Sequence, residues 1–164
     1  MSAQTRYGYK PPVGVPGSLY DISPYAMNSR SNGETEAGAL RFGMGVMQGN
    51  TPGQTIRKPT ASSRLSDFEG VAMTGFTSEL DMDGRLMVPP DKTVNVLRWG
   101  RAWVKVEEML TIAYGEPVYL ITRGANAGLF TNIAAGNMKI NATFIGGLGS
   151  TDTAPIELYN QKND

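Results

Sequence analysis

The chain of 164 residues contains no cysteine and no histidine. Without cysteine it has no disulfide framework and no thiolate nucleophile. Without histidine it lacks the commonest general base, the commonest transition-metal ligand and the usual sensor of physiological pH. Catalytic sites of the Ser-His-Asp or Cys-His kind and His-rich metal sites are therefore impossible within this chain.

Long apolar runs and an excess of one charge are also absent. The first residues, MSAQTRYGYKPP, hold no apolar stretch of the kind a secretory signal needs, and no run approaches the roughly 20 apolar residues of a membrane span. The 15 basic and 15 acidic residues balance to zero, without the basic density of a nucleic-acid binder. We therefore expect a protein made in a cytoplasm-like compartment, or packaged into something assembled there, with no membrane, nucleic-acid or cofactor partner.

Glycine and proline are abundant instead, with 20 Gly and 10 Pro scattered between short apolar runs. This distribution favours an all-β domain with many turns. The clearest period of two places small apolar residues on one face and larger or charged ones on the other: Ala102, Val104 and Val106 against Arg101, Trp103, Lys105 and Glu107. Such an alternation indicates a half-buried antiparallel strand. Gly100, between this run and the β-rich run 93–99, predicts a bulge or a sharp bend at a barrel corner.

Other short apolar runs extend the same pattern through the chain. Strands are predicted at 39–48, 68–77, 85–88, 118–121, 129–131, 138–145 and 156–159. The polar, turn-rich stretch 26–38 predicts a loop, with Asn32-Gly33 as a hairpin turn or loop tip. With about eight strands and no helix, the expected fold is a small antiparallel β-barrel or sandwich with an extended N-terminal arm. We divide the chain into an arm and polar loop over 1–38 and a barrel-like body over 39–164.

The first 25 residues are predicted to form the arm, because their four prolines oppose helix and central strand alike. A freely solvated tail would explain the prolines, but not the four spaced tyrosines, which are good anchors on a neighbouring surface. Residues 1–65 hold seven Lys/Arg and three Asp/Glu, whereas residues 66–164 hold eight and twelve. This asymmetry favours attraction between subunits, or a partner of mixed charge.

Two tryptophans, four residues apart and flanked by arginines, suggest a second contact surface. They could stack on a sugar or base, form an interface hot spot, or serve as one core Trp and one edge Trp covered by an arginine stem. We favour one buried and one at an interface. With the arm, the candidate interface residues are Tyr7, Tyr9, Pro11, Pro12, Tyr20, Tyr25, Arg98, Trp99, Arg101 and Trp103.

No catalytic or metal-binding residues are assigned. Glu79, Asp81 and Asp83 resemble the start of an EF-hand loop, but Pro90 stands where the twelfth position needs Glu. The remaining carboxylates show no spacing that selects an acid-base pair. We therefore expect a binding protein and not an enzyme.

The order of these motifs resembles the head cement, or capsid decoration, proteins of tailed bacteriophages. The resemblance lies in YKPPVGVPGSLYDISPYAMNSRSNGE, ALRFGMGV, FEGVAMTGF, VNVLRWGRAWVKVEE and GEPVYLI, and it extends over most of residues 7–148. It implies a small β-barrel-like protein on the outside of an expanded capsid, where it stabilises contacts between major capsid protein subunits. It also implies a homo-oligomer, with a trimer favoured and a dimer possible, and a place on the virion exterior after assembly in the host cytoplasm.

Two other classes of protein remain as alternatives. A tail or baseplate module that binds carbohydrate would use Trp99 or Trp103 as a free aromatic face. A trimeric β-barrel nucleotide hydrolase of the dUTP pyrophosphatase kind is less favoured, because the chain lacks its G-x-x-D and Y-R-G segments and has its arm at the other end.

Overall fold

The computed structural model describes residues 13–75, 80 and 82–161. Within them the chain forms nine strands and one 3₁₀ turn, η1 (Leu65–Asp67). The strands are β1 (Ala26–Asn32), β2 (Gly45–Gln48), β3 (Thr55–Arg57), β4 (Phe68–Met73), β5 (Thr93–Lys105), β6 (Pro117–Leu120), β7 (Phe130–Thr131), β8 (Met138–Phe144) and β9 (Thr153–Leu158). The predicted all-β class is confirmed. No helix in the described residues is long and apolar enough to cross a bilayer.

Five of the strands close into a barrel. Their order is β1-β3-β2-β4-β5, and β1 also pairs with β5, which completes the ring. All pairs are antiparallel except β1 with β3. A compact apolar cluster belongs to this half of the molecule: Leu40, Phe42, Val46, Ile56, Ala72, Val88, Val94 and Val96. The predicted barrel is therefore present.

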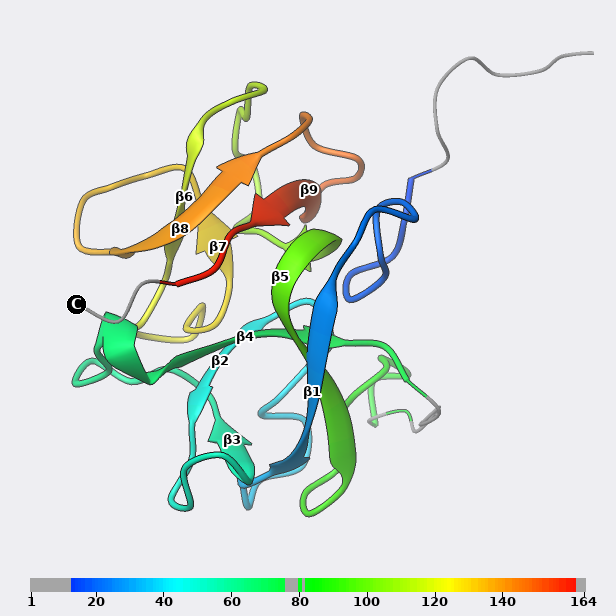
Figure 1. Ribbon diagram of the computed structural model, residues 1–164, viewed down its shortest axis with the longest axis vertical. Helices are drawn as coiled ribbons and strands as arrows, with labels where there is room; N and C mark the ends of the chain where they lie inside the picture. The colour runs from blue at the N-terminus through cyan, green and yellow to red at the C-terminus, as the bar shows by residue number, and fades with distance from the viewer. Residues whose placement is uncertain (1–12, 76–79, 81, 162–164) are drawn as a thin grey trace, which may run out of the picture.

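A second group of strands continues from β5 in the order β5-β9-β8-β6-β7. Just beyond β5, Val106 forms a parallel bridge with Phe130 of β7, so this group also curves back on itself. Figure 1 shows the two groups as two lobes, with β5 passing from one into the other. The larger core cluster combines side chains of both lobes and joins them by apolar packing.

Gly100 lies where β5 changes partners. Up to Trp99 the strand pairs with β1 and β4, and from Gly100 onward it pairs with β9. Gly100 has a φ of 132°, and a Cβ there would lie 2.7 Å from the Cβ of Tyr25. Only glycine satisfies both the backbone conformation and the close approach. The predicted bend at Gly100 is confirmed, and β5 continues through it as a single strand.

The segment 13–25 packs along β5. Gly17 donates its backbone N–H to Trp103 at 2.8 Å, and Leu19 forms a bridge with Ala102. Gly17 also accepts a hydrogen bond from the backbone N–H of Thr74 at 2.8 Å. The described part of the predicted arm is thus bonded to the body of its own chain.

The predicted loop over 26–38 is wrong in its first seven residues, which form β1. Sequence patterning missed this strand because its residues are mostly polar and show no apolar alternation. One of them, Asn32, is fully buried and donates from its side-chain amide to the carbonyl of Val88 at 2.9 Å. The division of the chain at residue 38 stays a prediction, but β1 itself pairs with β3 and β5.

Several strand boundaries also differ from the prediction. The run 39–48 forms a strand only at β2, since Gly43 has a φ of 82° and interrupts extended structure. The short β3 was not predicted, and it contributes three residues to the barrel. The run 85–88 contributes only the bridge between Leu80 and Leu86.

Candidate functional site

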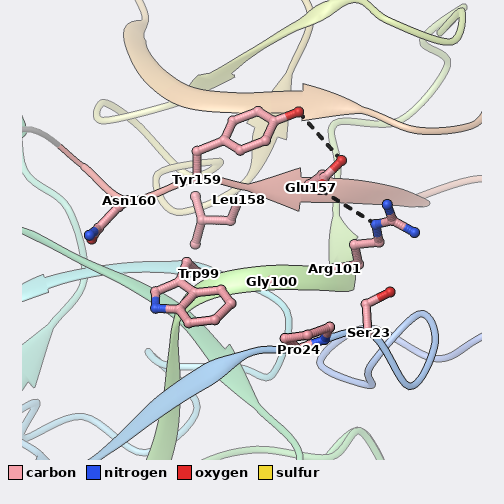
Figure 2. A pocket seen from close by; sticks show the side chains of 9 residues that line it. All are labelled: Ser23, Pro24, Trp99, Gly100, Arg101, Glu157, Leu158, Tyr159 and Asn160. Atoms are coloured by element: carbon pink, nitrogen blue, oxygen red, sulfur yellow. Dashed lines mark hydrogen bonds and ion pairs between the residues drawn. The ribbon is translucent and has the colours of Figure 1, made fainter.

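A hollow of about 620 Å³ opens beside Gly100, where the two lobes meet. Figure 2 shows it between β5, β9 and the segment that precedes β1. Its lining comes from three distant parts of the chain: Ser23 and Pro24, Trp99 to Arg101, and Glu157 to Asn160. The pairing of β9 with β5 sets these last two parts side by side, with Gly100 opposite Leu158.

Aromatic and apolar side chains line part of this hollow. Trp99 is 37% exposed and Tyr159 41% exposed, and in Figure 2 their rings lie on either side of Leu158. Pro24 adds a further apolar ring near Gly100. Tyr25 follows Pro24 and is 48% exposed. Exposed Trp and Tyr side chains close to one another are typical of interaction surfaces.

Arg101 links two acidic side chains at the edge of the hollow. Its guanidinium lies 3.0 Å from the carboxylate of Asp21 and 3.5 Å from that of Glu157. The phenol of Tyr159 donates to Glu157 at 3.4 Å. Hydrogen bonding to Ser23 is the main cause that holds the pKa of Asp21 below its ordinary value; burial opposes it, and Arg101 adds a smaller lowering effect. At neutral pH this edge carries two negative charges and one positive charge.

The two tryptophans have different environments, and one of them is buried as predicted. Trp103 is only 7% exposed, because the segment 13–20, which runs beside β5, packs Val13, Gly14 and Tyr20 around its ring. The ring of Tyr20 lies 5.5 Å from its ring, and a Cβ at Gly14 would overlap it. The prediction that Ala102, Val104 and Val106 face the core is confirmed, but the opposite face is covered at Trp103. An interface role for Trp99 stays a prediction.

Arg98 belongs to a separate ion cluster. The carboxylate of Glu69, 4% exposed, lies 3.4 Å from Arg98 and 3.4 Å from Arg30. The side chains of Arg30 and Arg98 are 16% and 35% exposed. Sequence reasoning missed Arg30 and assigned no partner to Glu69, although the place of Glu69 in the apolar run FEGVAM was a signal.

The remaining predicted residues divide into two sets. Tyr20 packs inside the chain's own fold and Tyr25 lies on the surface. Tyr7, Tyr9, Pro11 and Pro12 lie outside the described residues. The hollow also contains side chains that sequence reasoning missed, chiefly Glu157 and Tyr159. Their distance from Trp99 in the sequence gave no signal, since only the β5–β9 pairing joins them.

A metal centre has no support in the part of the chain that the structure describes. No three His, Cys, Asp or Glu side chains gather there in a way that could hold an ion. The hollow offers aromatic faces, an arginine, carboxylates and the amide of Asn160. Such groups bind by stacking, hydrogen bonding and charge, and they suit recognition of another molecule.

Comparisons with known proteins indicate the same class of protein as the sequence motifs do. A family model described as structural cement protein (E217 gp24/Pam3 gp6) matches residues 3–159. Among solved structures, a chain from the capsid of Myoviridae phage XM1 superposes with a TM-score of 0.72. The superposition covers 98% of this chain and 99% of the XM1 chain at 20% sequence identity, which shows a shared fold. No curated protein matches the chain. Since the family model covers both lobes and the hollow, this chain belongs to the structural cement protein family.

Proposed function

We propose that the protein binds the outer surface of a phage capsid and stabilises contacts between major capsid protein subunits. The observation that carries this proposal is the family match over residues 3–159. The fold shared with a chain of a phage capsid adds support. The proposed place of the protein is the virion exterior, after assembly in the host cytoplasm.

The architecture suits a protein that holds others together. The two lobes share β5, and the larger apolar cluster packs side chains of both lobes against one another. A single contact with the shell can be weak, because a capsid repeats it many times and an oligomer engages several sites at once, which raises avidity without new contacts. We propose a homo-oligomer, with a trimer favoured over a dimer.

The proposed interface, with the capsid or with another subunit, combines residues 7–12 with the surface near Gly100. It consists of Tyr7, Tyr9, Pro11, Pro12, Tyr25, Arg98, Trp99 and Arg101. Tyr20 and Trp103, which the sequence also predicted for the interface, are not included, because they pack against each other within the chain. Their role is to hold the segment 13–20 on β5.

Co-sedimentation with phage heads that lack the protein tests this function. Expanded and unexpanded heads are each mixed with the full chain and with a variant lacking residues 1–12. That deletion leaves the covering of Trp103 intact, whereas removal of residues 1–25 would also strip β5 of Gly17 and Leu19. Binding to expanded heads is expected. If neither variant binds any head, the cement function is wrong.

The carbohydrate-binding alternative uses the same hollow, since the rings of Trp99 and Tyr159 line it together with Arg101 and Glu157. It predicts that the isolated protein binds glycans with no capsid present. A glycan array with the wild type and Trp99→Ala separates the two functions. Trp99-dependent glycan binding, together with no binding to heads, would favour the tail or baseplate module.

A further inference from the structure

The hollow has the chemistry that recognises an extended, proline-containing segment. Proline-rich peptides dock on grooves lined by aromatic rings, and they lose little conformational entropy because proline already restricts the backbone. Trp99 and Tyr159 supply such rings, and Pro24 and Leu158 add apolar surface between the lobes. The carboxylates of Asp21 and Glu157 lie at the edge, neutralised in part by Arg101.

The chain contains a segment with the matching chemistry in residues 1–12, here called the N-terminal tail. Its sequence, MSAQTRYGYKPP, ends in two prolines and holds two tyrosines. It carries Arg6 and Lys10 and no acidic residue, whereas the edge of the hollow carries one negative charge in excess. Apolar rings and charge therefore complement each other between the tail and the hollow.

The tail joins the described chain at Val13, at the end of the segment 13–25 that is remote from the hollow of its own chain. This segment runs antiparallel to β5. The backbone N–H of Tyr20 donates to the carbonyl of Arg101 at 3.0 Å, and that of Gly17 to the carbonyl of Trp103 at 2.8 Å. Val13 lies beyond these contacts, against Gly149, and so at the end remote from Trp99. Pro11 and Pro12 oppose a reversal at that point, because each fixes φ and biases the preceding residue to extended geometry.

We propose that the hollow beside Trp99 binds the N-terminal tail of a second copy of this chain. Twelve extended residues reach about 40 Å, which is enough to cross from one small domain to its neighbour. The contact is directional, from the tail of one copy to the hollow of the next. When the copies close into a ring, every tail occupies a hollow and every hollow holds a tail. The tail thereby links copies to each other, and this contact does not need the capsid.

Mixed single-cysteine variants test the proposal, because the natural chain has no cysteine. Tyr9→Cys in one preparation and Asn160→Cys in another, of different size through a tag, are mixed without heads and oxidised. A disulfide-linked species containing both chains is expected. Tyr9→Cys mixed with Gln54→Cys is the matched control, since Gln54 is exposed in the turn before β3, far from Gly100 along the barrel.

Two further variants separate specific docking from chance collision. Trp99→Ala in the acceptor chain should lower the yield of the mixed species roughly tenfold or more, as for a central aromatic anchor. Arg6→Glu with Lys10→Glu in the donor chain should also lower it, because these changes reverse the positive charge of the tail. The thermal melt of Trp99→Ala checks that its fold is intact.

Other outcomes would overturn the proposal. These are no mixed species, equal yields with the Gln54→Cys partner, a yield independent of Trp99, and a bond that forms only within one chain when Tyr9→Cys and Asn160→Cys are combined. Because heads are absent, this failure is distinct from a failure of the cement function. Binding to heads would still be measured separately by co-sedimentation.

Discussion

Replacing Gly70 with alanine should destabilise the barrel where β4 pairs with β5. Gly70 has a φ of 142°, and a Cβ there would lie 2.0 Å from the carbonyl oxygen of Leu97. Since the obstacle is backbone, no side-chain rotation relieves it. The unfavourable φ costs about 1–3 kcal/mol, and overpacking adds about 1–3 kcal/mol. The free energy of unfolding should therefore fall by about 2–6 kcal/mol.

Thermal unfolding, followed by tryptophan fluorescence, measures this change. For a chain of this size about 2–4 °C of Tm corresponds to 1 kcal/mol, so the expected fall is about 4–24 °C. Gly53→Ala is the matched control: its φ is 80°, but nothing lies within 4 Å of the added methyl group. It should lose only about 1–2 kcal/mol. Equal shifts for the two variants would refute the close approach of β4 to β5.

Three further changes test other parts of the structure. Trp103→Ala should cost about 3–5 kcal/mol and release the segment 13–20, which faster chymotrypsin cleavage at Tyr20 would reveal; an unchanged digestion rate would contradict the packing. Glu69→Gln leaves two partly buried arginines without their carboxylate and should lower the free energy of unfolding by about 3 kcal/mol in urea titrations; a loss under about 1 kcal/mol would contradict the ion cluster. Asp21 has a folded pKa below its unfolded one, so its contribution to stability is present above about pH 4 and lost as the pH falls through the folded pKa. The Tm difference between wild type and Asp21→Asn should therefore shrink toward pH 2, and a constant difference would contradict this assignment.

Sequence patterning found the strands whose buried residues are mainly apolar. Val71 and Met73 share a face and a core cluster, as the period of two in β4 indicates. The same holds for Ala102 and Val104 in β5. Gly100 was also identifiable, because a glycine inside a strand pattern has few explanations other than a bend or a close approach.

The strand β1 escaped prediction because its burial is polar. Arg30 and Asn32 are held inside by partners from other parts of the chain: Glu69 for the first and Val88 for the second. A buried polar residue is acceptable only when its partners are present, and those partners are known only once the barrel has closed. Local sequence therefore could not distinguish β1 from a loop.

The candidate site shows the same limit. Trp99 and Trp103 lie four residues apart in similar sequence surroundings, yet only the second is covered. The covering comes from residues some 90 positions earlier, through the hydrogen bonds of Gly17 and Tyr20 to β5. The sequence could predict that one tryptophan is buried, but the identity of the buried one depends on which stretch of β5 the segment 13–20 runs beside.

The placement of both ends of the proposed contact on β5 bears on how a cement protein transmits force. The root of the tail is fixed to Ala102 and Trp103 through Leu19 and Gly17, and the hollow is built on Trp99 and Arg101 of the same strand. A pull from a neighbour on the tail would therefore reach the hollow of the same copy through about four residues of one strand. That strand is bonded to β1 and β4 in one lobe and to β9 in the other. The two attachment points are joined by the covalent backbone of β5, so what resists a pull on the tail is the set of hydrogen bonds that hold Gly17, Ser18 and Tyr20 to that strand.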